Sequence, residues 1–228
     1  MTTKEDWTAT RAAIIRDALG IGIATGAYAL SFGAISTAAG LSIAQTCALS
    51  ALMFSGASQF ALVGVLASGG GAATAAATAA LLGSRNALYG LRLGGLLRVR
   101  GPRRLVAAHL VIDESTAMAV AREDERAGRL GFWSTGLSVL VLWNLGTLLG
   151  AVGAQALDDP RVLGLDAAVP AAFLALLAPR LRSRQPWAIA LGAAAVALVA
   201  APFVPVGVPV LLAAVAAAVL TLRPGGRA

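Results

Sequence analysis

Long apolar stretches separated by short polar turns are the dominant pattern of this 228-residue chain. No charged residue occurs between Asp17 and Arg85, a stretch far longer than the roughly 20 residues that cross the core of a bilayer. Helices satisfy their own backbone polar groups in lipid, and the alternating pattern of barrel strands is missing. We therefore predict an all-α polytopic membrane helix bundle, organised as one membrane domain over residues 1–228.

The apolar stretches predict about seven spans plus one short interfacial or re-entrant helix. Residues 1–16 are polar and mixed in charge, so we expect a tail rather than a cleaved signal peptide. The expected spans are 18–39, 42–66, 72–97, 132–157, 163–180, 187–203 and 207–222, with the short apolar helix at 105–121.

The arginine-rich loops predict the orientation. Residues 98–104, 122–129 and 180–184 and the C-terminal tail should be cytoplasmic, because arginine and lysine concentrate on that side. The loop with Asp158 and Asp159 can then lie outside. This arrangement requires that 105–121 lies at the interface or dips in and returns. It also places the N-terminus outside.

A weak internal repeat accompanies this topology. Sliding the chain by about 113 positions pairs Gly33 with Gly146 and Phe60 with Phe173. The two halves would then start from opposite sides of the membrane, as the inverted repeats of many secondary carriers do. Chance matches are easy in a sequence so rich in alanine and glycine.

Composition agrees with a membrane protein and narrows the chemistry. The chain is 58% hydrophobic and 13% charged, with a mean hydropathy of +0.79. Its net charge of +7 comes from arginines in the gaps between apolar stretches, which favours membrane anchors over a nucleic-acid site. Cys47 and His109 are each the only residue of their type. We therefore expect no disulfide, no metal site and no catalytic residues.

A polar cluster interrupts the second predicted span. Ser55, Ser58 and Gln59 share one helix face by their spacing. One interpretation is packing, because small residues and hydroxyls mediate close helix contacts in membranes. The other is a locally broken helix that binds a zwitterionic solute.

Arg85 lies inside the third predicted span, followed by Asn86 and, one turn later, Tyr89. Burying an arginine in a membrane is costly and marks a partner or a pathway. Its planar fork fits a carboxylate, either of a protein acid or of an amino-acid substrate. The alternative is that Arg85 extends to the cytoplasmic interface, which lies roughly 20 Å away along the helix at Arg98.

Three acids are candidates for proton coupling. Asp113 and Glu114 are adjacent and have apolar flanks on both sides, and Asp166 precedes the apolar stretch near Pro170. Each could instead be a solvated residue at the end or on the exposed face of a helix. Asn144 could contact substrate or bridge helices.

In combination, these motifs resemble the AzlC family, the large subunit of two-component branched-chain amino-acid exporters. The resemblance covers nearly the whole chain in order. It rests on Ser31-Phe32-Gly33, Leu49 to Phe60 with Phe54-Ser55-Gly56-Ala57-Ser58-Gln59-Phe60, Ser84-Arg85-Asn86, Leu88-Tyr89, Asp113-Glu114, and Leu163-Gly164-Leu165-Asp166 to Phe173.

The resemblance implies a secondary carrier in the cell membrane that exports Leu, Ile and Val, with Met as a further candidate, and works with a small AzlD-type membrane subunit. It implies no bound cofactor. The substrate-binding candidates are Ser55, Ser58, Gln59, Arg85, Asn86, Tyr89 and Asn144, and the proton-coupling candidates are Asp113, Glu114 and Asp166.

Two other classes remain open at this stage. A passive channel would use similar helices without titratable coupling groups. An intramembrane enzyme would need a nucleophile with a base or several metal ligands, and one His with one Cys argues against it. A phosphate-binding loop with lysine is missing, which favours the proton gradient over ATP as the energy source.

Overall fold

The computed structural model describes residues 4–156, 174, 177–178 and 181–222. Throughout this part of the chain the secondary structure is helical, which confirms the all-α prediction. The helices are α1 (Lys4–Ala38), α2 (Ile43–Leu52), α3 (Gly56–Ala67), α4 (Ala72–Leu97), α5 (Pro102–His109), α6 (Asp113–Val120), α7 (Glu125–Gln155), α9 (Arg184–Ala200) and α10 (Val208–Leu222). The predicted span 163–180 and Asp166 lie outside the described helices.

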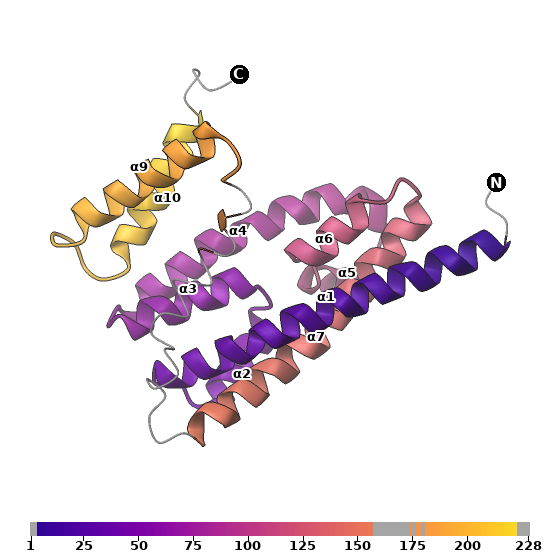
Figure 1. Cartoon of the computed structure of the whole chain (residues 1–228), viewed down its shortest axis with the longest axis horizontal. Coiled ribbons are helices and arrows are strands. Elements are labelled where there is room, and N and C mark those ends of the chain that lie inside the picture. The colour runs from indigo at the N-terminus through magenta and orange to yellow at the C-terminus, as the bar shows by residue number, and fades with distance from the viewer. Residues whose placement is uncertain (1–3, 157–173, 175–176, 179–180, 223–228) are drawn as a thin grey trace.

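Helices α1 and α7 are the longest pair, and each is long and apolar enough to cross a membrane. They lie side by side and run in the same direction (Figure 1). Glycines bring the two backbones together: Gly33 packs on Thr147 and Gly146 packs on Gly26, so residue numbers rise together along both helices. A Cβ atom on Gly26 would lie 2.8 Å from the Leu142 carbonyl oxygen. This seam therefore depends on the absence of side chains.

The predicted second span is a re-entrant hairpin. After α1 the chain enters the bundle as α2, leaves helical conformation at 53–55, and returns as α3 antiparallel to α4 (Figure 1). Ser58 at the start of α3 lies beside Gly83 in the middle of α4. Val65 near the end of α3 and Thr74 near the start of α4 both lie next to Gly207, so the two helices run in opposite directions. Ser55 is the extended residue that begins α3, a position that serine favours.

A second hairpin enters from the opposite end. Helix α5 begins with Pro102, a favoured first position, and runs inward. After an extended Ile112, α6 runs back antiparallel to α7, with Leu110 against Gly136 and Met118 against Gly131. Figure 1 shows the two hairpins approaching each other from the two ends of the bundle.

These hairpins test two predictions. A single helix over 42–66 is wrong, because the chain is not helical between α2 and α3. The helix break that one interpretation of the Ser55–Gln59 cluster required is present, and the binding of a zwitterionic solute there stays a prediction. The expectation that 105–121 does not cross is also confirmed, because it dips in and returns as two helices. Elsewhere, α4 matches the predicted span 72–97, and α1 begins at Lys4 rather than after a polar tail.

The start of α1 lies next to the turn between α6 and α7. Arg122 forms an ion pair with Asp17 at 3.2 Å, and the Arg126 guanidinium lies 3.9 Å from the centre of the Trp7 ring. The N-terminal end of α1, the 98–101 loop and the 121–124 turn therefore form one end of the bundle, which we call the basic end.

The structure places the start of α1 at the same end as the 121–124 turn, so the prediction that they lie on opposite sides is wrong. At the opposite end, the turns 39–42, 68–71 and 201–207 carry no charged residue. By the positive-inside rule we expect the basic end, with the start of α1, to face the cytoplasm. The sequence prediction placed the N-terminus outside because it counted 42–66 as a crossing, which reverses everything before it.

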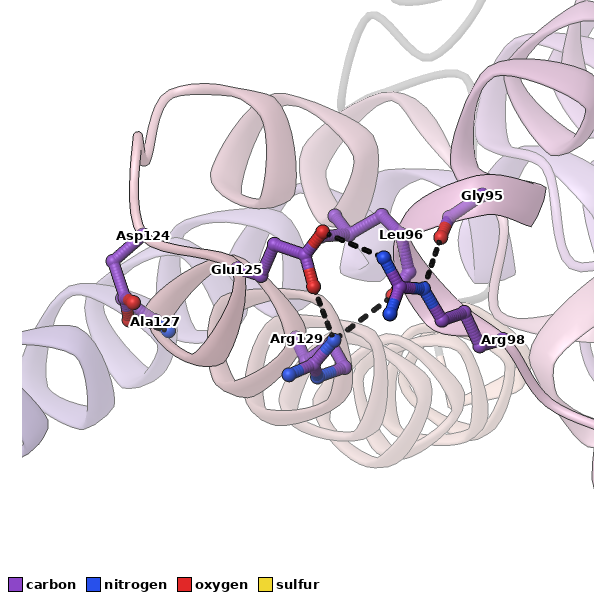
Figure 2. Close-up of polar contacts among 7 residues, drawn as sticks. All are labelled: Gly95, Leu96, Arg98, Asp124, Glu125, Ala127 and Arg129. Atoms are coloured by element: carbon purple, nitrogen blue, oxygen red, sulfur yellow. Dashed lines mark hydrogen bonds and ion pairs between the residues drawn. The ribbon is translucent and has the colours of Figure 1, made fainter.

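Glu125 fastens the end of α4 to the start of α7 at the basic end (Figure 2). Its two carboxylate oxygens accept hydrogen bonds from Arg98 at 2.9 Å and from Arg129 at 3.0 Å. Arg129 also donates to the Leu96 carbonyl at 3.3 Å. This ion-pair network links α4 and α7, the two helices that precede and follow the second hairpin.

The predicted repeat does not describe inverted halves. An offset of about 113 residues superposes α1 on α7, and these helices are parallel. The opposed units are shorter: α1 with its hairpin α2–α3, and α4 with its hairpin α5–α6, which enter from opposite ends (Figure 1). Gly33 and Gly146 match because both lie on the α1–α7 seam.

Candidate functional site

A cavity of about 280 Å³ lies where the two hairpin tips meet α1, α4 and α7. Its size is near the lower limit of sites for small organic ligands, about 300 Å³. The described residues that line it are Ala24, Thr25, Tyr28, Phe54, Ser55, Gly56, Ala57, Arg85, Asn86, Ile112, Asp113, Glu114, Val139 and Trp143.

An ion pair forms the charged wall of this cavity. Arg85 of α4 donates to Asp113, the first residue of α6, at 2.8 Å. The side chains are 27% and 34% exposed, so both are half-buried, and both line the cavity. Of the two carboxylates considered for Arg85, a protein acid or a substrate, the structure shows a protein acid, Asp113. The pair joins the third predicted span to the second hairpin.

Several polar atoms at the cavity are buried and lack a hydrogen-bond partner among the described residues. They are Arg85 Nε, Asp113 Oδ1, Asn86 Oδ1 and the Tyr28 hydroxyl. Buried polar groups are normally paired, so such a group at a cavity requires a reason. Their arrangement supplies donors and acceptors close together, as the ammonium and carboxylate of one small zwitterion require.

Glu114 is the second acid at the cavity. It is the residue after Asp113 and lines the same space, but it forms no ion pair within the described structure. Asp113 therefore neutralises Arg85, whereas Glu114 is a separate carboxyl group at the cavity wall. The two adjacent acids thus have different environments.

The N-terminus of α3 also faces the cavity. Gly56 and Ala57, in its first turn, line the space, and no side chain caps this helix end. The Ser55 hydroxyl lies 3.2 Å from the Ser58 hydroxyl instead. Free backbone N–H groups and the helix dipole favour an anionic group there. The site therefore offers a carboxylate two attractive partners, Arg85 and this helix end.

Gln59 lies behind the cavity wall and is fully buried. Its Nε2 donates to the Ser50 and Met53 carbonyls, both at 3.1 Å, at the end of α2. Its Oε1 accepts a 2.9 Å hydrogen bond from the Trp143 indole of α7. One amide therefore holds the broken ends of the first hairpin and an aromatic residue of the cavity together.

A second cavity, of about 450 Å³, lies on the other side of the hairpin tips. Phe54, Ser55 and Asn86 line both cavities and form the wall between them. The Phe54 ring stacks on the His109 ring with centroids 5.6 Å apart, which joins the two tips directly.

The predicted site residues divide into three groups. Ser55, Arg85, Asn86, Asp113 and Glu114 converge on the first cavity. Ser58 lines only the second cavity, and Gln59, Tyr89 and Asn144 are not among the described lining residues of either. Tyr89 packs against the hydrophobic core, and the Asn144 amide donates to the Leu140 carbonyl at 2.8 Å. Asp166 lies outside the described residues.

Sequence analysis missed the aromatic residues of the cavity, Tyr28 and Trp143. Trp143 immediately precedes Asn144, which the sequence predicts as a substrate-binding candidate. The available signal was its position: tryptophan in membrane proteins concentrates at the headgroup level, and Trp143 lies deep inside α7. Among the described residues, no group of three or more His, Cys, Asp and Glu side chains could hold a metal ion.

Comparison with known proteins identifies the family. The model of the AzlC protein family matches residues 20–157, which include both hairpins and every described lining residue of the first cavity. The chain belongs to the AzlC family. It is also similar to the inner membrane protein YgaZ of Escherichia coli (strain K12), with 29% identity over 178 residues, 75% of this chain and 73% of that protein. No solved structure matches. The AzlC chain is a multi-pass protein of the cell membrane with a role in transport.

Proposed function

We propose that this AzlC protein is a proton-coupled secondary exporter of branched-chain amino acids. The observation that carries the proposal is the Arg85–Asp113 ion pair at a cavity bounded by two opposed re-entrant hairpins. Broken helices that meet inside the membrane are typical of secondary carriers, whose substrates bind at such helix ends. The transport role of the family agrees with this arrangement.

The two walls of the cavity match the two parts of such a substrate. One wall carries Arg85, Asp113 and the α3 N-terminus, which suit a carboxylate and an ammonium group. The other wall is apolar and includes Val139 and Trp143, and the Trp143 indole lies against Gly56 at the α3 N-terminus. An aliphatic side chain of Leu, Ile, Val or Met would bury its surface there.

Glu114 is our candidate for the proton carrier. It lines the cavity without an ion-pair partner in the described structure, so its carboxyl group is available to exchange a proton as the substrate enters or leaves. Asp113 is held by Arg85 and is less suited to this role. Protonatable side chains inside a membrane commonly serve as proton relays in transporters.

A small AzlD-type membrane subunit is part of the proposal. Its support is the family resemblance, and α4 and α7 have apolar residues exposed on their outer faces, among them Leu88, Leu91 and Val141. Lipid would cover these faces equally well. Co-expression is therefore the test: efflux of labelled leucine should rise when the AzlD-type subunit accompanies this chain.

The central experiment is efflux of labelled leucine from proteoliposomes with an imposed proton gradient. Arg85→Ala should lower efflux about 10- to 100-fold, because a hydrogen bond to a charged group contributes about 1.5–3 kcal/mol. Arg85→Lys keeps the charge but loses the fork and should not restore full transport. Arg92→Ala, an exposed arginine of the same helix, is the matched control and should transport normally.

Two outcomes would contradict the proposal. Normal leucine efflux from Arg85→Ala at wild-type protein levels would show that transport does not need the ion pair. Wild-type efflux that does not respond to collapse of the proton gradient would indicate a passive channel.

A further inference from the structure

We propose that Trp143 sets the upper size limit for the substrate side chain, and that Gln59 is the positioning residue that holds its indole in place. The inference rests on the proposed function and identifies which residue determines specificity within the same cavity. It concerns two residues that are buried in the structure, Trp143 at 5% exposure and Gln59 at 0%.

The indole presents only hydrocarbon to the cavity. Its polar atom, Nε1, donates to Gln59 Oε1 at 2.9 Å, and Gln59 lies behind the wall rather than on it. The opposite side of the six-membered ring lies against Gly56, where a Cβ atom would come within 3.0 Å of Cη2. The ring therefore fills the space between the first turn of α3 and the apolar part of the cavity.

The indole has little freedom to turn. Tyr28, Phe32 and Phe60 surround it, with ring centroids at 6.0, 6.2 and 6.4 Å respectively. Gln59 itself is held by the carbonyls of Ser50 and Met53. Rotating the indole would break its buried hydrogen bond and leave Gln59 Oε1 without a donor, which is costly in a low-dielectric interior.

A fixed ring at this place limits the length and width of the ligand. The charged wall with Arg85 and Asp113 comes from α4 and α6, whereas Trp143 comes from α7. A substrate held by its ammonium and carboxylate at the first wall would direct its side chain toward the second. Aliphatic side chains fit the remaining space, and an aromatic side chain would overlap the indole.

The test uses two substitutions with opposite expected effects on the substrate preference of reconstituted transporter. Trp143→Ala enlarges the apolar part, so the ratio of phenylalanine to leucine transport should rise about tenfold, within the range that a hydrophobic pocket discriminates. Gly56→Ala places a methyl group against the indole and narrows the space, so the ratio of valine to leucine transport should rise.

Gln59→Met tests the positioning role. It removes the amide that holds the indole while keeping an unbranched side chain of similar length. The phenylalanine-to-leucine ratio should therefore move in the same direction as in Trp143→Ala, by a smaller factor. An unchanged ratio in transport-competent Gln59→Met would refute this role.

Trp187→Ala and Gly90→Ala are the matched controls. Trp187 is half exposed on α9, and a Cβ atom on Gly90 would meet nothing within 4 Å. Both should keep the wild-type ratios. If Trp143→Ala and Gly56→Ala lower transport of all substrates by one factor, Trp143 is a packing residue and the inference fails. If Trp143→Ala does not fold, Gly56→Ala alone decides. Wild-type protein that does not transport leucine would instead contradict the proposed function.

Discussion

At the scale of single residues, the two adjacent acids of α6 differ in what surrounds them. Asp113 accepts a 2.8 Å hydrogen bond from Arg85, whereas Glu114 has no ion-pair partner in the described structure. From the sequence, only the longer side chain of Glu114 favours it for coupling, because the two acids are neighbours with the same apolar flanks. The distinction comes from the middle of α4, where Arg85 forms an ion pair with Asp113 only.

We therefore predict different transport defects for the two acids. Glu114→Gln should abolish uphill leucine efflux but retain exchange of leucine down its gradient, because only the proton carrier is lost. Asp113→Asn should impair both activities, because it leaves Arg85 without its counter-charge. The measurement is proton-driven efflux compared with exchange in the same vesicles. Uphill efflux that persists in Glu114→Gln would show that Glu114 is not the proton carrier.

Sequence patterns located the charged residues of the site but not the aromatic ones. A charge within an apolar helix is unusual enough to be selected, and Arg85, Asp113 and Glu114 were found in this way. Trp143 is one apolar residue among many, and its importance arises from the Gln59 hydrogen bond, which joins positions 84 residues apart. Such a contact has no local sequence signature.

At the scale of helices, the α1–α7 pair depends on a seam of glycines. We predict that Gly26→Leu will lower the thermal stability of the purified protein, because any side chain at this position meets the Leu142 backbone. Inserting atoms into a packed interface costs about 1–3 kcal/mol. Gly153→Leu on α7 is the control, since a Cβ atom there would meet nothing within 4 Å. The melting temperatures of the two variants are measured in detergent. Equal melting temperatures would contradict close packing of α1 and α7 at Gly26.

The hairpins show where hydropathy is a sufficient guide to helices and where it is not. Apolar length predicted α4 correctly and brought α9 and α10 within three residues of their boundaries. It cannot distinguish one crossing helix from two half-helices that enter and return, because both are continuous apolar stretches. The distinguishing feature of 42–66 was the Ser55–Gln59 cluster, where serine favours a helix start and Gln59 satisfies the freed carbonyls of α2.

At the scale of the whole molecule, one misassigned crossing reversed the predicted side of the N-terminus. The arginine loops alone indicated that the basic end is cytoplasmic, and the structure adds that Trp7 and Asp17 of α1 lie at that same end. The two hairpins then enter from opposite sides of the membrane. The cavity lies between their tips, with α1, α4 and α7 completing its lining.

This arrangement predicts a definite pattern of accessibility in intact cells. In a Cys47→Ala background, a cysteine at Ala38, exposed at the end of α1, should react with an impermeant maleimide added outside. A cysteine at Ala9, exposed near the start of the same helix, should react only after the membrane is permeabilised. Both positions lie on one helix, so expression and folding affect them alike. Labelling at Ala9 but not at Ala38 would put the basic end outside and contradict the cytoplasmic placement of the N-terminus.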